Sequence, residues 1–132
     1  MIKFKPICVV RSEIKEVKDA PFHWTLSDVE GKIEIFEDFK DGLKGIEKLP
    51  YLVILFHFHK SRGYELLQRT PHDDNTHGVF SICSPHRPNS IGMSVVKLLK
   101  VEDNVLYVKN IDMIDGTPVL DIKPYIPLNK DK

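Results

Sequence analysis

The sequence predicts an all-β protein, a small and mostly antiparallel β-barrel with one short helix. About six short segments have the composition of strands, turn residues separate them, and long segments with helical periodicity are absent. Closing an antiparallel sheet into a barrel removes its exposed edges, which makes a barrel the natural arrangement. A chain of 132 residues is long enough for one core, and we expect a single domain over residues 1–132.

The first half of the chain predicts three strands and the helix. Residues 7–10 form an apolar run, and residues 32–35 alternate polar and apolar with the period of a half-buried strand. Apolar residues recur at helical spacing over 39–49, although Gly42 and Gly45 weaken this helix. Residues 51–59 are β-branched and aromatic, which predicts a strand buried on both faces with His57 and His59 on one face.

The second half begins with a polar stretch over residues 60–76, for which we predict no strand. Further strands are expected over 78–82, 91–101 and 105–108, with residues 102–104 as a hairpin turn. Asp115 to Pro118 reads as a turn, and residues 123–127 read as an extended tail stiffened by two prolines.

Composition excludes several classes of function. The 19 basic and 19 acidic side chains give a net charge of zero, so any RNA site must be a local patch. The longest apolar run, residues 51–56, is too short to cross a bilayer, and no signal peptide precedes it; we expect a soluble, cytoplasmic protein without a membrane segment. Glycine-rich dinucleotide and phosphate-binding motifs and the serine-hydrolase motif are absent from the sequence.

A proline-rich loop over residues 84–92 is the first candidate binding element. Pro85 and Pro88 restrict the unfolded chain, so Arg87 and Asn89 lose less entropy when they meet a ligand. The alternative is a proline-rich turn in which Arg87 forms an ordinary ion pair with an acidic neighbour.

Asp112, Asp115 and Asp121 form the second candidate element, in the sequence around Gly116. Three carboxylates so close together are costly to bury unless they are paired. Either Asp115 accepts backbone N–H bonds of its own turn, or the turn cradles a small polar ligand that Gly116 allows to approach closely.

Histidines with Cys83, Asp73 and Asp74 nearby form a third pattern. The set comprises His57, His59, His72, His77 and His86. The spacing of His57 and His59 suits a metal site, but no third ligand follows at a diagnostic spacing, so we predict no metal. Cys8 and Cys83 show no disulfide or zinc pattern, and reduced thiols are expected.

Two long motifs resemble the signature of one enzyme family. Ser84-Pro85-His86-Arg87-Pro88-Asn89-Ser90-Ile91-Gly92 and Asp115-Gly116-Thr117-Pro118-Val119-Leu120-Asp121-Ile122-Lys123-Pro124-Tyr125 are similar, in order and spacing, to those of tRNA N6-threonylcarbamoyladenosine methyltransferases. The resemblance covers nearly the whole chain, as a short form without the carboxy-terminal domain of many bacterial members. Where family members commonly have Thr-Arg, this chain has Ile82-Cys83.

The resemblance implies a β-barrel that binds S-adenosylmethionine, as a homodimer with the cofactor near the subunit interface, and methylates N6 of the modified adenosine at position 37 in the tRNA anticodon loop. The implied cofactor-binding residues are His59, Lys60, Cys83, Arg87, Asn89, Leu98, Ile114, Asp115, Gly116 and Thr117.

The acceptor nitrogen is a poor nucleophile, so we expect Asp112, Asp115 or His59 to assist removal of its proton. A basic rim around the substrate is expected from Arg62, Arg69, Arg87, Lys97 and Lys123. The alternatives are a methyltransferase of the same scaffold with another substrate, a non-enzymatic barrel that binds RNA or an adenosine ligand, and metal-dependent hydrolysis through the histidines.

Overall fold

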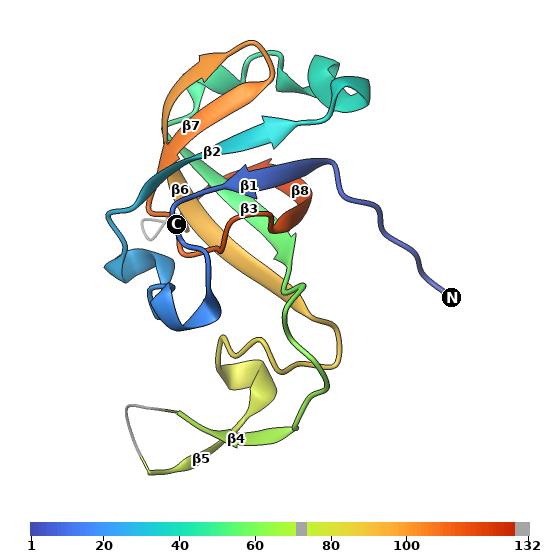
Figure 1. Cartoon of the computed structure of the whole chain (residues 1–132), viewed down its shortest axis with the longest axis vertical. Helices are drawn as coiled ribbons and strands as arrows, with labels where there is room; N and C mark the ends of the chain where they lie inside the picture. The colour runs from blue at the N-terminus through green and yellow to red at the C-terminus, as the bar shows by residue number, and fades with distance from the viewer. Residues whose placement is uncertain (71–73, 129–132) are drawn as a thin grey trace.

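Six strands of the computed structural model close into a barrel in the order β1-β2-β7-β6-β3-β8 (Figure 1). The structure describes residues 1–70 and 74–128. The barrel strands are β1 (Cys8–Arg11), β2 (Glu30–Ile35), β3 (Tyr51–His57), β6 (Ile91–Glu102), β7 (Val105–Lys109) and β8 (Pro118–Pro124). Neighbouring strands are antiparallel all around the ring, which an even number of strands allows. The predicted fold class is confirmed.

Alternate residues of each strand fill the barrel interior. In β3, Leu52, Ile54 and Phe56 are 0%, 0% and 5% exposed, whereas Tyr51 and His57 at its ends are exposed. The prediction of a strand buried on both faces is therefore wrong, because a barrel strand has a single inner face and the outer face of β3 is only partly covered.

The two cysteines occupy opposite environments. Cys8 is fully buried in the barrel, where burial and, to a smaller degree, the charge of Asp121 raise the pKa of its thiol to about 12. Cys83 is exposed, and both are free thiols.

The strand predicted over residues 78–82 is wrong. The short strand β5 (Thr76–Gly78) ends there, and the 3₁₀ turn η5 (Val79–Ser81) follows, with Val79 1% exposed and Phe80 80% exposed. The sixth barrel strand is instead β8, which the sequence presented as a turn and a tail. Pro118 and Pro124 are its first and last residues, where the missing N–H disturbs the ladder least.

The predicted helix over residues 39–49 is replaced by two 3₁₀ segments, η3 (Glu37–Leu43) and η4 (Ile46–Lys48). Gly45 separates them with a φ of 86°, a left-handed conformation that interrupts a helix. Two further 3₁₀ turns, η1 (Val17–Asp19) and η2 (Trp24–Leu26), lie between β1 and β2. Across the described ranges, helices with the length and apolar character needed to span a membrane are absent.

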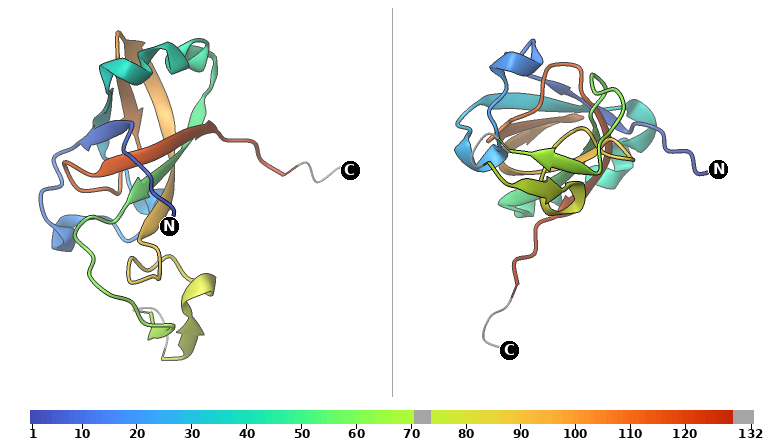
Figure 2. Two further views of the ribbon diagram at one scale, coloured as in Figure 1. Left: turned by 90° about the vertical axis from the view of Figure 1, so that its right-hand side faces the viewer. Right: turned by 90° about the horizontal axis from the view of Figure 1, so that it is seen from below.

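Residues 58–70 and 74–90, which we call the arm, leave the barrel between β3 and β6 and project beyond one of its ends (Figures 1 and 2). The arm contains the two-stranded sheet of β4 (Leu67–Arg69) and β5, in a region where no strand was predicted. The Val79 amide donates to the Leu66 carbonyl at 2.8 Å, which fastens η5 to this sheet.

Gly92 is expected to tolerate no side chain. Gly92 lies opposite Phe56 in the sheet, and a Cβ there would overlap Cζ of Phe56 and lie 2.8 Å from Cζ of Phe58. Those two rings pack edge to face with centroids 5.0 Å apart, so Gly92→Ala is expected to lower the free energy of unfolding by about 1–3 kcal/mol in a urea titration. Gly42→Ala, with nothing within 4 Å of the added Cβ, is the control; equal stabilities for the two variants would contradict this packing.

Candidate functional site

A cleft of ≈ 690 Å³ lies where the arm joins the barrel. Six segments supply its walls: the end of β3 with the start of the arm, the start of β6, residues 68–70 and 82–87, and parts of 17–23 and 112–117. A volume of this size lies within the range of small-molecule and cofactor sites, about 300–1,000 Å³.

Strand pairing brings the two sequence motifs to this cleft. His57 pairs with Ile91, so the arm must leave and return at the same point of the barrel. On the opposite wall, the Gly116 amide donates to the Val10 carbonyl at 2.8 Å and the Val10 amide donates to the Thr117 carbonyl at 3.0 Å. Residues 82–87 and 112–117 therefore face one cleft although they are far apart in the sequence.

Arg87 closes the proline-rich loop on itself. Its Nη1 donates to the carbonyl oxygens of Ile82 and Ser84 at 2.8 and 3.1 Å. Ser61 Oγ donates to the Pro85 carbonyl at 3.0 Å, and Gln68 Nε2 donates to the His86 carbonyl at 2.7 Å. Within the described ranges no acidic partner of Arg87 is found. Hydrogen bonds to the backbone carbonyls of the loop therefore hold its conformation, and the loop is preorganised at the cleft.

Asp112 is the one carboxylate among the described residues that line the cleft. Ser94, which is fully buried, donates from Oγ to Asp112 Oδ1 at 2.6 Å. Burial raises the pKa of Asp112, and the Ser94 hydrogen bond and the nearby His23 oppose this shift only in part. A carboxylate held in one orientation with a raised pKa is suited to accept a proton.

Asp115 lies on the other side of the same segment and does not line the cleft. Its Oδ1 accepts from the Ser12 amide at 3.1 Å, and Lys15 Nζ lies 3.2 Å from Oδ2. Desolvation acts to raise the pKa of Asp115, but these partners outweigh it and hold the pKa below its usual value. Asp115 therefore accepts its backbone hydrogen bond from the segment that follows β1, and not from an N–H of its own turn.

His57 and His59 both line the cleft, but they do not share a strand face as predicted. β3 ends at His57, and the His59 amide donates to the His57 carbonyl at 2.9 Å in a tight turn. Burial, with the neighbouring charge of Lys60, lowers the pKa of His59. His72 and Asp73 lie outside the described residues, and among the residues that are described no three histidine, cysteine or acidic side chains gather as metal ligands.

The cleft brings together part of the predicted site. Its lining includes Asp112, His59, Lys60, Cys83, Arg87, Ile114 and Thr117. Four predicted residues are not part of the lining: Asn89, Leu98, Asp115 and Gly116. Asn89 is exposed on the loop, Leu98 packs against the core, and Gly116 supports the turn with a φ of 85°.

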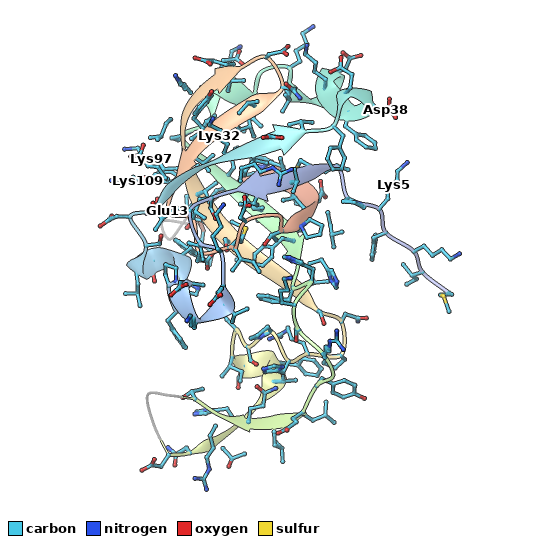
Figure 3. The ribbon with its side chains drawn as sticks, viewed as in Figure 1. Lys5, Glu13, Lys32, Asp38, Lys97 and Lys109 are labelled. Atoms are coloured by element: carbon cyan, nitrogen blue, oxygen red, sulfur yellow. The ribbon has the colours of Figure 1, made fainter. Side chains whose placement is uncertain are left out.

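Other cleft residues were not selected from the sequence, among them Gln68 and Met93, together with Ser94 behind Asp112. The basic rim was predicted in part: Arg69 and Arg87 line the cleft, but Lys97 lies on the outer surface of the barrel beside Lys109 (Figure 3). Lys123 pairs with Asp121 at 3.1 Å.

The lining is electropositive. Three basic side chains, Lys60, Arg69 and Arg87, border the cleft against the single carboxylate of Asp112 in the described part of its wall. This segregation concentrates positive potential in one concavity of a chain with zero net charge.

Comparison with known proteins relates the chain to a methyltransferase family. The family model described as tRNA-methyltransferase O N-terminal domain matches residues 9–131. A probable S-adenosyl-L-methionine-binding protein of Pyrococcus abyssi is 42% identical over 128 residues, covering 96% of this chain and 70% of the relative. A tRNA (adenine(37)-N6)-methyltransferase of Mus musculus is 48% identical over 95 residues, covering 70% of this chain and 22% of the relative.

The solved structure of TrmO from Pseudomonas aeruginosa is 36% identical, with a TM-score of 0.80 over 96% of this chain. The match covers 57% of that chain, so the present chain spans little more than half the length of the solved relative.

Removing the guanidinium of Arg87 is expected to loosen the loop without unfolding the barrel. Arg87→Met loses both hydrogen bonds to carbonyls, and charged hydrogen bonds contribute roughly 1.5–3 kcal/mol each. Amide hydrogen exchange over residues 82–87 should accelerate about tenfold or more, while amides of β3 and β6 keep their rates. Arg62→Met, an exposed change in the same arm, is the control; unchanged exchange in Arg87→Met would show that the loop is held by other contacts.

Proposed function

Because the chain belongs to the family of tRNA-methyltransferase O N-terminal domains, we propose that it is an S-adenosylmethionine-dependent methyltransferase that acts on tRNA. The proposed acceptor is N6 of threonylcarbamoyladenosine at position 37, in the anticodon loop. The main support from the geometry is the meeting of both signature motifs in one cationic cleft of cofactor size.

The residues of the cleft fit an adenosyl sulfonium cofactor. Lys60 and Arg69 provide cations for the carboxylate of its amino-acid end, while Ile82, Met93 and Ile114 provide apolar surface for the adenosyl end. The bound cofactor supplies an electrophilic methyl group, and the protein must hold the acceptor nitrogen in line with it. Most of the catalytic effect is therefore positioning, which a preorganised loop achieves at low entropic cost.

Asp112 is the proposed acceptor of the N6 proton. Ser94 holds the Asp112 carboxylate in place, and this carboxylate would accept the proton that N6 loses when the bound cofactor supplies the methyl group. His59 is the second candidate, since it also lines the cleft and its lowered pKa keeps the imidazole neutral. Asp115, fixed by Ser12 and Lys15 outside the cleft, is a structural residue in this proposal.

The proposal includes a homodimer with the cofactor near the subunit interface. Met93 borders the cleft yet is 56% exposed, and Ile91 beside it is 40% exposed. Apolar side chains at the rim of a site are surface that a second subunit would cover.

A binding role without catalysis is the second candidate, because the Pyrococcus abyssi relative is named only for binding S-adenosylmethionine. Calorimetry with S-adenosylmethionine and mass spectrometry of tRNA nucleosides after incubation separate the two functions. Heat of binding and methylated threonylcarbamoyladenosine are expected. Heat without any methylated nucleoside supports the binding role, methylation of another nucleoside changes the substrate, and the absence of heat excludes both functions.

Asp112→Asn is expected to slow methyl transfer about 100-fold or more in single-turnover assays, because general-base catalysis contributes roughly 10²–10⁴. Asparagine still accepts the Ser94 hydrogen bond, so the affinity for S-adenosylmethionine should hold. Asp115→Asn is the matched comparison: it should keep the methyl-transfer rate and lose up to about 1 kcal/mol of stability through its partly exposed pair with Lys15. The reverse pattern would make Asp115 the functional carboxylate.

The pH dependences of rate and stability should have opposite signs. The Asp112 anion accepts the proton, and burial raises its pKa, so the rate is expected to fall as pH drops through that raised pKa. The stability that this carboxyl contributes is fully present at a pH below the pKa of Asp112 in the unfolded chain. It is lost as the pH rises through the higher pKa of Asp112 in the folded protein. Both dependences should vanish in Asp112→Asn; a rate profile that is unchanged in this variant would assign the titration to another group.

A further inference from the structure

The arm presents apolar side chains to solvent. Tyr64, Leu66, Leu67 and Phe80 are 56%, 57%, 67% and 80% exposed, and together with Arg62 and Arg69 we call them the arm surface. A two-stranded sheet is marginally stable alone, so its apolar residues would be expected to bury themselves. In this arm Val79 does so, and Gln68 ties the sheet to the loop carbonyl of His86. The four exposed side chains add little to the fold, and exposed apolar residues concentrated in one projecting element indicate an interaction site.

The arm surface is continuous with the cleft. Arg69 belongs to both, and Gln68 and Thr70 on either side of it also line the cleft. In the sheet register Leu67 lies opposite Gly78 and Arg69 lies opposite Thr76, so Leu67 and Arg69 share one face of β4. A ligand that lies along this face can therefore contact the arm surface and the cationic wall of the cleft at the same time.

The charge distribution favours a polyanion as the occupant. The described residues of the arm carry four cations, Lys60, Arg62, Arg69 and Arg87, against Glu65 and Asp74. Lys60, Arg69 and Arg87 all line the cleft, and of the described acidic residues of the arm neither Glu65 nor Asp74 does. Three of these four cations thus lie on the side of the arm that faces the cleft.

We propose that the arm surface binds the single-stranded RNA that flanks the base held in the cleft. Unpaired bases stack on Tyr64 and Phe80, and the phosphates between them meet Arg62 and Arg69. The proposal rests on the proposed function, because it takes the cleft as the place where one base of that RNA is methylated. It assigns substrate recognition to an element other than the cofactor loops.

The test measures binding of a fluorescein-labelled anticodon stem-loop RNA by anisotropy at two salt concentrations. Phe80→Ala is expected to weaken binding about tenfold, since stacking on an aromatic ring dominates such contacts. Phe4→Ala, a ring that is 70% exposed on the amino-terminal segment, should bind like the wild type. Arg62→Gln is expected to weaken binding and to reduce its salt dependence, whereas Lys97→Gln on the outer barrel surface should do neither.

Calorimetry with S-adenosylmethionine on the same variants keeps the two proposals apart. Cofactor heat in all variants with lost RNA affinity in Phe80→Ala and Arg62→Gln supports the arm surface. Cofactor heat with wild-type RNA affinity in both overturns it and leaves the proposed function standing. Absence of cofactor heat in the wild type overturns the proposed function, even if RNA binding still depends on Phe80. If sedimentation shows instead that Phe80→Ala dissociates an oligomer while RNA affinity is unchanged, the arm surface is a contact between copies of this chain.

Discussion

The structure depends on β8 pairing on both of its sides, with β1 and with β3. Without this strand the sheet would remain open, and the edges of β1 and β3 would stay unpaired. Closure also requires the segment before β8 to cross the mouth of the barrel, which carries Asp112 and Thr117 to the point where the arm begins and ends. The cleft is therefore a product of closure: each wall is a chain segment entering or leaving a strand that the barrel holds in register.

Much of the fold follows from local patterns. Strand composition, alternation and turn residues predicted β1, β2, β3, β6 and β7 within a few residues, because all three are properties of the segment itself. β8 was missed since its two prolines read as punctuation, whereas in the barrel they stand at the strand ends. The segment over 78–82 has strand composition, but no barrel strand is left to pair with it, and it turns instead. Which strands pair is decided by the closed sheet as a whole, so local composition does not predict it.

The site was predictable only where a motif carried it. The resemblance pointed to the loops around Arg87 and Thr117, which do meet in the cleft, but it also named Leu98, which packs against the core. Ser94 could have been found only from the alternation of β6, which places it inside the barrel, combined with the position of Asp112 across the interior. The zero net charge of the chain gave no indication of the cationic cleft, because the net charge does not report where the basic and acidic side chains lie.

The contrast between the two thiols has a practical consequence. Cys8, with its pKa raised to about 12 inside the barrel, stays protonated and out of reach of maleimides at neutral pH. Cys83 is exposed on the wall of the cleft. The native chain therefore accepts a fluorophore or spin label at a single position, beside the cavity, without any engineering, and ligand entry becomes observable by spectroscopy.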